Sequence, residues 1–346
     1  MIKIEDLGII LEKTKNPFEN EAVLNPECIR EDNHIHMFYR AVGKDKLSLE
    51  KTSSIGYCKL SLKDHKVIER WEKPMLYPEF YFEKQGLEDP RITKIDDTYY
   101  LVYVGYDGKN ARIAYATSAN LKNWQKKGVL SPSFTYDEAE NIFRANKLQE
   151  RYFLFESIYK IKLGEEIKLW EKDAFLLPKK INNQFVLFHR ILPGIQVIYF
   201  EKFEDLTDEY WRKYLKKLRE HIVLNPKYWF ESRNIGGGCV PIEVLEGWIL
   251  IYHSVEDTNE SKIYHASAAL IDKNDPTKIL GRLKDPFFSP KEKWELEGSV
   301  NNVVFPSASI VDRNDLIIYY GAADRLIAAK KVNLKELTNY LLESGT

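Results

Sequence analysis

The sequence predicts an all-β fold, a five-bladed β-propeller with a helical insertion and a short C-terminal helix. Short runs rich in Tyr, Val, Ile and Phe alternate with Gly, Asp, Asn and Lys turns along most of the 346 residues. Five hairpin-like units recur, and each lacks an outer partner strand, as the central strands of propeller blades would. A β-sandwich assembled from unrelated hairpins is the alternative.

The five predicted hairpins share one form, in which a turn precedes an aromatic strand, a polar loop and a second strand. They pair His34–Ala41 with Ser54–Leu60, Thr98–Tyr106 with Ala111–Ser118, Asn183–Ile191 with Gly194–Phe200, Gly247–Val255 with Lys262–Leu270, and Asp315–Ala322 with Arg325–Val332. In the second hairpin neither face of the first strand is strongly polar, which indicates a strand buried on both sides.

Two segments have the apolar spacing of helices. Residues 204–222 place Leu206, Tyr210, Leu215, Leu218 and Ile222 at helical intervals, with Asp205 or Thr207 as N-cap candidates. Residues 334–344 predict a short terminal helix. No low-complexity linker divides the chain, so we expect residues 1–346 to form one catalytic domain.

The composition excludes several functional classes. Hydrophobic residues make up 44% of the chain, and 51 basic residues against 52 acidic ones leave a net charge of −1. This balance argues against a nucleic-acid surface or a polybasic membrane patch. The first residues lack the features of a signal peptide, and no run of 18 apolar residues predicts a membrane span.

The cysteines and histidines predict neither disulfides nor a metal site. Cys28, Cys58 and Cys239 are odd in number and form no CxxC motif, so we expect buried thiols and a cytoplasmic protein. His34 and His36 are interpreted as an exposed strand edge rather than a ligand pair. No cofactor is predicted, and a homo-oligomer is left open.

The stretch Glu88-Asp89-Pro90-Arg91 stands directly before the second hairpin. A turn closed by an Asp–Arg ion pair would explain it, but the additional glutamate favours a function. Neighbouring residues of a strand point to opposite sides, so one carboxylate would reach a substrate while the other makes structural bonds. Comparable polar groups recur at other strand ends, which a propeller gathers around its central channel.

The ordered motifs of the chain resemble those of glycoside hydrolase family 130, the β-mannoside phosphorylases and related β-mannosidases. The motifs are NPE (25–27), MFYRAV (37–42), GLEDPRI (86–92), YDGKNARIAYATS (106–118), KDAFLLPKKINNQFVLFHRI (172–191), IGGGCVPI (235–242), GWILIYHSV (247–255), VNNVVFPS (300–307) and YYGAAD (319–324). The resemblance covers nearly the whole chain and also implies a five-bladed β-propeller. Cys239-Val240-Pro241 and Ser254 depart from the family pattern. These departures bear on the substrate subsites more than on the class of reaction.

The resemblance implies a role for each motif residue. Asp89 would be the general acid, passing its proton through a substrate hydroxyl, while inorganic phosphate, the co-substrate, attacks with inversion to give α-mannose 1-phosphate. By motif position the phosphate ligands would be Arg112 and Lys180, with His189, Arg190 and His253. The predicted substrate-binding residues are Asn25, Arg40, Glu88, Arg91, Tyr106, Asp107, Asp173 and Asp324.

Phosphorolysis and hydrolysis make different demands on the site. An inverting hydrolase needs a second carboxylate to activate water, whereas a phosphorylase needs cations that hold its anionic nucleophile. The predicted cationic group favours a phosphorylase acting on mannobiose or short manno-oligosaccharides. Glu231 and Glu140 lie in predicted loops and keep an inverting β-mannosidase open. A non-catalytic carbohydrate-binding propeller is the third alternative.

Overall fold

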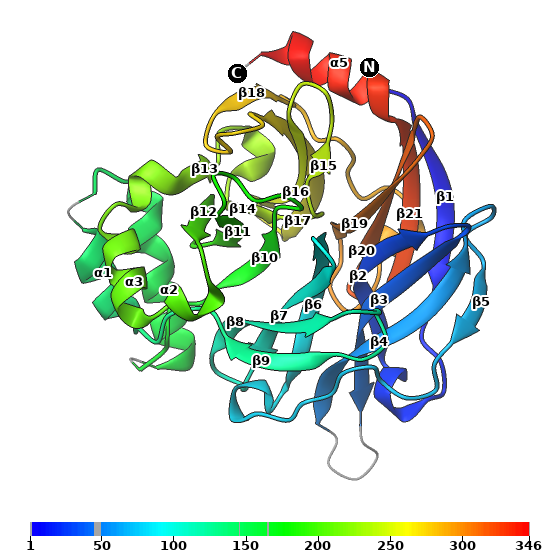
Figure 1. The fold of residues 1–346 in the computed structure, drawn as a ribbon, viewed down its shortest axis with the longest axis horizontal. Coiled ribbons are helices and arrows are strands. Elements are labelled where there is room, and N and C mark those ends of the chain that lie inside the picture. Colours follow the sequence, from blue (N-terminus) through cyan, green and yellow to red (C-terminus); the bar gives the residue numbers. More distant parts are fainter. Residues whose placement is uncertain (1, 45–49, 145, 165, 346) are drawn as a thin grey trace.

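The computed structural model describes residues 2–44, 50–144, 146–164 and 166–345, and most of its regular structure is β (Figure 1). The all-β prediction is therefore confirmed. Cys28, Cys58 and Cys239 are buried free thiols, as expected. Within the described ranges no helix has both the length and the apolar composition that spanning a membrane requires.

The described strands form five antiparallel units in four hydrogen-bonded sheets. The largest sheet contains two of these units, whose strands are paired with each other through one parallel bridge between Ser53 and Gly86. The units are β2 (Ala22–Glu31), β3 (His34–Lys44), β4 (Lys51–Ser61) and β5 (Val67–Arg70); β6 (Gly86–Ile95), β7 (Thr98–Tyr106), β8 (Ala111–Ser118) and β9 (Gln125–Val129); β10 (Lys172–Leu176), β11 (Phe185–Arg190), β12 (Ile195–Phe200) and β13 (Ile222–Leu224); β14 (Asn234–Gly237), β15 (Ile242–Glu243), β16 (Trp248–Asp257), β17 (Lys262–Ile271) and β18 (Ile279–Arg282); and β19 (Val304–Asp312), β20 (Asp315–Ala322), β21 (Leu326–Asn333) and β1 (Ile4–Leu11).

The predicted hairpins are the middle strands of these units. The pairs β3–β4, β7–β8, β11–β12, β16–β17 and β20–β21 are antiparallel, and β7 and β8 have the predicted bounds. In the fifth unit the outer position is taken by β1, so the first strand of the chain pairs with the last one.

The first strands of successive units lie against one another around a common centre. Strand β2 contacts β6, β6 contacts β10, and β10 contacts β14, while β19 contacts β16, β17 and β2 (Figure 1). Residues at equivalent positions of these strands are thereby brought together from distant parts of the sequence. The five-bladed arrangement itself stays a prediction.

A buried glutamate recurs beside these units. In four of them it lies in the turn or short helix before the first strand and accepts a hydrogen bond from a tyrosine of the second strand. The pairs are Tyr39–Glu19 (2.7 Å), Tyr103–Glu83 (2.6 Å), Tyr252–Glu231 (2.8 Å) and Tyr320–Glu295 (2.5 Å). A cation from a later strand or turn completes each cluster: Arg70, Lys126, Arg282 and Lys330. In the third unit Glu171 and His189 make the corresponding pair, at 2.7 Å.

The helices agree with the prediction only in part. Helix α5 (Leu334–Ser344) is confirmed, but the continuous helix predicted over residues 204–222 was wrong in extent. Helix α3 covers only Asp208–Leu215, between the 3-10 turns η4 (Phe203–Asp205) and η5 (Leu218–His221). The break before α3 follows from Thr207, which takes an extended conformation and caps the helix by accepting from the Tyr210 amide.

A second helical segment was not predicted. Helices α1 (Tyr136–Phe143) and α2 (Leu154–Leu163), with η3 (Glu150–Phe153) between them, lie between β9 and β10. They pack with α3 on the outer side of the third unit (Figure 1). Their position matters because α2 supplies side chains to the central cavity described next.

Candidate active site

A cavity of about 260 Å³ opens at the centre of the five units. Its walls combine charged side chains from the strands with apolar side chains from the rim. The lining residues are Asn25, Arg40, Asp89, Phe155, Tyr159, Lys172, Asp173, Arg190, Leu192, Arg233, Asn234, His253, Lys262, Tyr264, Val300, Val303, Phe305 and Asp324.

Three lining residues occupy the same irregular position on the first strands of the first three units. Asn25, Asp89 and Asp173 have φ angles of 48°, 52° and 55°, and each lies where the strand register shifts against its neighbour. Asn and Asp tolerate this left-handed backbone better than other side-chain-bearing residues, and such bulges redirect side chains. The local sequence therefore explains why these three groups face the cavity.

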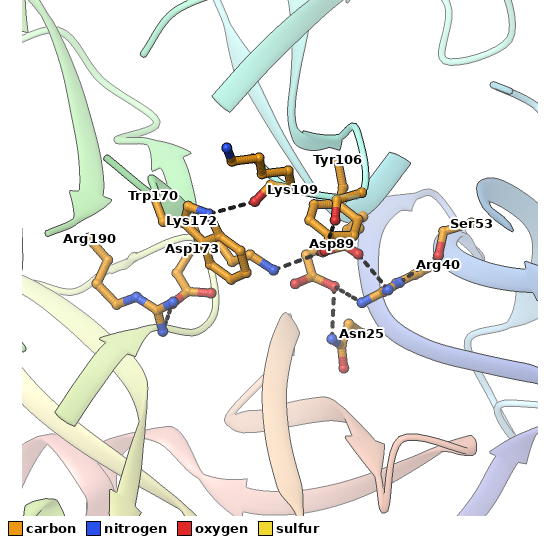
Figure 2. Close-up of polar contacts among 12 residues, drawn as sticks. Asn25, Arg40, Ser53, Asp89, Tyr106, Lys109, Trp170, Lys172, Asp173 and Arg190 are labelled. Carbon is orange, nitrogen blue, oxygen red and sulfur yellow. Dashed lines mark hydrogen bonds and ion pairs between the residues drawn. The ribbon is translucent and has the colours of Figure 1, made fainter. Parts of the chain in front are cut away.

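Two side chains hold the same oxygen of Asp89 (Figure 2). Asn25 Nδ2 donates to Asp89 Oδ1 at 2.8 Å, and Arg40 Nη1 lies 3.8 Å from the same oxygen. The Asp89 side chain is only 8% exposed, yet it lines the cavity. A carboxyl group in this setting is positioned to exchange a proton with a molecule bound in the cavity.

The neighbouring carboxylate, Glu88, makes structural bonds, in line with the expected division between the two acids. Glu88 Oε1 accepts from Arg40 Nη2 at 2.6 Å, and Oε2 accepts from Lys172 Nζ at 2.9 Å. Burial alone would raise the pKa of Glu88, but Arg40 and Lys172 lower this pKa to about 2. Glu88 is therefore ionised at neutral pH and fixes two cations beside Asp89.

A second charged group occupies another wall of the cavity. Arg190 Nη1 lies 2.6 Å from Asp173 Oδ2, and His253 Nε2 lies 3.8 Å from the same oxygen. Burial lowers the pKa of His253 to about 4, so its imidazole is neutral at pH 7 and can donate one hydrogen bond. Both nitrogens of His253 lack a hydrogen-bond partner among the described residues.

Cations also line the rim. Arg233 lies above the ring of Phe155, 5.5 Å from its centroid, and pairs with Asp257 at 3.0 Å. Tyr159, from the same helix as Phe155, packs on Trp170 at a centroid distance of 4.6 Å. These contacts join the unpredicted helix α2 to the cavity wall.

The lining carries a net positive charge although the chain as a whole does not. Its Lys and Arg residues are Arg40, Lys172, Arg190, Arg233 and Lys262, and its Asp residues are Asp89, Asp173 and Asp324. With His253 neutral this leaves two positive charges in excess, whereas the whole chain has a net charge of −1. Such a cavity favours an anion.

Only part of the predicted site lies in the described cavity lining. Of the predicted phosphate ligands, Arg190 and His253 line it, whereas Lys180, His189 and Arg112 do not. Lys180 lies 3.6 Å from Asp96 and over the Phe185 ring, and Arg112 donates to the Ser131 carbonyl. His189 is fully buried between Glu171 and Tyr214. Alternation along β11 explains this placement, because His189 must point away from the side that Arg190 faces.

The predicted substrate-binding residues divide in the same way. Asn25, Arg40, Asp173 and Asp324 line the cavity, and Glu88 lies behind it. Arg91 is buried and donates to the carbonyls of Gly238 and Pro90, while Asp107 accepts from the amides of its own turn. Tyr106 donates to the Gly108 carbonyl. These last three residues shape the surrounding backbone rather than the lining.

The sequence analysis missed several lining residues, namely Lys172, Arg233, Asn234, Lys262 and Tyr264. Lys172 stands directly before the predicted Asp173 at the start of a strand, and this neighbourhood was the available sequence signal. The glutamates considered as hydrolytic bases lie elsewhere. Glu231 is buried with Tyr252 and Arg282, and Glu140 pairs with Arg144 on α1.

Several known proteins resemble this chain in sequence or in fold. A family model described as beta-1,4-mannooligosaccharide phosphorylase, that of glycoside hydrolase family 130, matches residues 5–343. A β-1,2-mannobiose phosphorylase from Thermoanaerobacter sp. (strain X514) is 36% identical over 350 aligned positions, covering 97% of this chain and 98% of that protein. A 1,2-β-oligomannan phosphorylase from the same organism is 32% identical over 340 residues, covering 97% and 98%.

A solved structure extends the likeness to the fold. The β-1,2-mannobiose phosphorylase from Listeria innocua, in complex with β-1,2-mannobiose, superposes with a TM-score of 0.74 at 22% identity. The match covers 98% of this chain and 99% of the other. On the extent of the family match and of the two relatives, the chain belongs to glycoside hydrolase family 130, and the prediction of an enzyme from this family of glycoside phosphorylases is confirmed.

Proposed function

We propose that the protein is an inverting glycoside phosphorylase that cleaves β-mannosides with inorganic phosphate and releases α-mannose 1-phosphate. The observation that carries this proposal is the cavity itself, in which one carboxyl group, Asp89, shares the walls with an excess of cations. An anionic nucleophile needs such cations, both for binding and for screening it from the acid.

In this mechanism Asp89 is the general acid. Its proton passes through a sugar hydroxyl to the glycosidic oxygen as the C1–O bond breaks, and a phosphate oxygen forms the new C1–O bond from the opposite face. Arg40 and Asp324 are placed to contact the mannosyl residue, since both line the cavity with Asp89. After each turnover the acid regains its proton from solvent.

The phosphate would bind to the group formed by Arg190, His253 and Lys172, with Arg233 and Lys262 nearer the rim. Arg190 stays charged at any physiological pH, and the neutral His253 supplies a hydrogen bond rather than a charge. Lys172 faces both Glu88 and the cavity, so it can interact with phosphate without losing its carboxylate partner.

Hydrolysis by the same site is less well supported. A water-activating base would need a second free carboxylate, but Asp173 is engaged by Arg190 at 2.6 Å. Asp324 is the remaining carboxylate in the described lining, and burial, ahead of the neighbouring charges, raises its pKa. Asp173 is therefore not free to act as that base, and hydrolysis would have to use Asp324 instead.

We further propose a β-1,2 linkage in the substrate and a five-bladed propeller as the catalytic domain. The linkage rests on the two Thermoanaerobacter relatives, both of which are named for β-1,2-linked substrates. The propeller is supported by the five antiparallel units, the contacts among their first strands, and the buried glutamate that recurs in each unit.

A product assay tests the function. The purified protein is incubated with β-1,2- or β-1,4-mannobiose, with and without phosphate, and followed by ³¹P and ¹H NMR. Phosphate-dependent release of α-mannose 1-phosphate from the β-1,2 substrate is expected. Free mannose as the sole sugar product would indicate hydrolysis, and no turnover of any linkage would favour the carbohydrate-binding alternative.

A further inference from the structure

The contact between Asn25 and Asp89 distinguishes the two oxygens of the acid. Oδ1 accepts from Asn25 Nδ2 at 2.8 Å and is also the oxygen nearest Arg40, at 3.8 Å. Within the described part of the chain Oδ2 has no hydrogen-bond partner, although Asp89 lines the cavity. Figure 2 shows Asn25 and Arg40 approaching the same side of the carboxyl group.

This arrangement determines where the proton of the acid resides. A proton on Oδ1 would point at an N–H donor and near a guanidinium, and it would remove the acceptor that Asn25 requires. A proton on Oδ2 avoids both conflicts and faces the cavity. We infer that Asn25 is a positioning residue for the acid, which keeps Oδ1 of Asp89 as an acceptor so that Oδ2 carries the proton toward the substrate. The inference rests on the proposed function, because it assigns Asn25 a part in proton delivery.

The position of the Asn25 amide depends on a glycine from the fifth unit. A Cβ atom at Gly321 would lie 2.2 Å from Asn25 Oδ1, too close for any real contact. Gly321 follows the buried Tyr320 on β20, just as Arg40 follows Tyr39 on β3 and Arg190 follows His189 on β11. The first and third units thus place a large cation at the position where the fifth unit leaves room for Asn25.

A leaving-group comparison tests the role of Asn25. Asn25→Gly removes the amide while tolerating the φ of 48° at this position. For phosphorolysis of β-1,2-mannobiose we expect kcat to fall by about 100-fold, the scale of a misplaced catalytic group. For 2,4-dinitrophenyl β-mannoside, whose phenolate leaves without a proton, the loss should be within about threefold, as it should for Asp89→Asn. Equal losses on both substrates, or a change in KM alone, would overturn the inference.

A second pair of variants separates positioning from sugar contact. Gly321→Ala should cause the same leaving-group-dependent loss, because its methyl group displaces the Asn25 amide. In the double variant Asn25→Gly/Gly321→Ala the amide is absent and the nearest atom left to the methyl group is the backbone nitrogen of residue 25, at 3.1 Å, so the loss should be close to that of Asn25→Gly alone. Losses that add would contradict this coupling.

A pH profile completes the test. Asn25→Asp keeps the size and backbone tolerance of Asn25 but places a second carboxyl group against Asp89, and two such groups share a proton. The high-pH limb of kcat/KM should therefore move upward, whereas an unchanged profile would show that residue 25 does not act on the acid. Failure of the proposed function is distinct, since the wild-type enzyme would then release no mannose 1-phosphate. If the wild-type enzyme hydrolyses mannobiose through Asp89, the comparisons of the Asn25 and Gly321 variants with wild type still test the inference. A wild-type protein that is inactive on both substrates would overturn the proposed function and the inference together.

Discussion

Arg40 and Glu88 form an ion pair of 2.6 Å between two antiparallel units whose strands are paired by a single parallel bridge. The pair lies directly behind Asp89. Lys172 from the third unit also pairs with Glu88, with 2.9 Å between Lys172 Nζ and Glu88 Oε2. Three units are therefore tied together by charge at the point where the acid faces the cavity.

Replacing Glu88 should destabilise the protein. Glu88→Gln leaves Arg40 and Lys172 without their carboxylate, and we expect the free energy of unfolding to fall by about 2 kcal/mol, less than for a fully buried pair because both cations keep some solvent contact. Chemical denaturation at pH 7 measures the change. Because the pKa of Glu88 is about 2 in the folded protein, the difference from wild type should persist above pH 4.5 and shrink as the pH falls toward 2.

An exposed pair provides the control for this experiment. Glu5 lies 3.0 Å from Lys331, but its side chain is 56% exposed. Glu5→Gln should change the free energy of unfolding by less than about 1 kcal/mol. Equal effects of the two substitutions would contradict the structural role given to Glu88.

Loss of the acid should abolish turnover without unfolding the chain. Asp89→Asn keeps the hydrogen-bonding shape and tolerates the φ of 52°, so the melting temperature should change little. The rate of mannobiose phosphorolysis should fall by about 10²–10⁴-fold, the usual contribution of a general acid. A variant as active as wild type would remove Asp89 from the mechanism.

The cationic wall should govern the phosphate requirement. Arg190→Met removes a charge from the cavity and leaves Asp173 unpaired, so the KM for phosphate should rise about 10- to 100-fold, and more than the KM for the mannoside. Initial rates at varied phosphate and saturating mannobiose measure this effect. Lys180→Ala is the matched comparison, since Lys180 contacts Asp96 and Phe185 instead of the cavity, and its KM for phosphate should stay within about twofold of wild type.

Acid should weaken the fold through His253. In the folded protein its pKa is about 4, whereas an unfolded chain binds the same proton near pH 6.5. The unfolded state therefore takes up more protons between these values, and the free energy of unfolding should fall by about 2 kcal/mol from pH 6.5 to 5. Denaturation of wild type and His253→Gln at both pH values isolates this contribution. The free energy of unfolding of the variant should fall less between pH 6.5 and pH 5 than that of wild type. An equal fall in the free energy of unfolding for both proteins would mean that His253 does not titrate as described.

Local patterns in the sequence were sufficient for the hairpins and the terminal helix. The strands β7 and β8 and helix α5 follow from alternation, turn residues and helical spacing over short windows, and all three have the predicted bounds. Helix α1 was not predicted, although the sequence contains a signal for it. Thr135 and Glu138 form a capping box at its N-terminus. The long helix over residues 204–222 failed because Thr207 acts as an N-cap inside the predicted span.

The site was harder to predict because it depends on contacts between units. Asp89 and Asn25 were identified by motif, but their hydrogen bond joins residues 64 positions apart. His189 and Arg190 were assigned to one function although adjacent strand residues face opposite sides. Tyr264 was not assigned, since nothing in its local sequence distinguishes a lining side chain from an exposed one before the units are assembled.

The pairing of β1 with β21 has a consequence for biosynthesis. Four units contain only strands that are contiguous in the chain, so they can assemble as each leaves the ribosome, but the fifth needs strands from both ends. Strand β1 must therefore wait, with an unpaired edge, until β21 has been translated. Joining the two ends by a short linker and opening the chain elsewhere, in a circular permutant, would remove that wait.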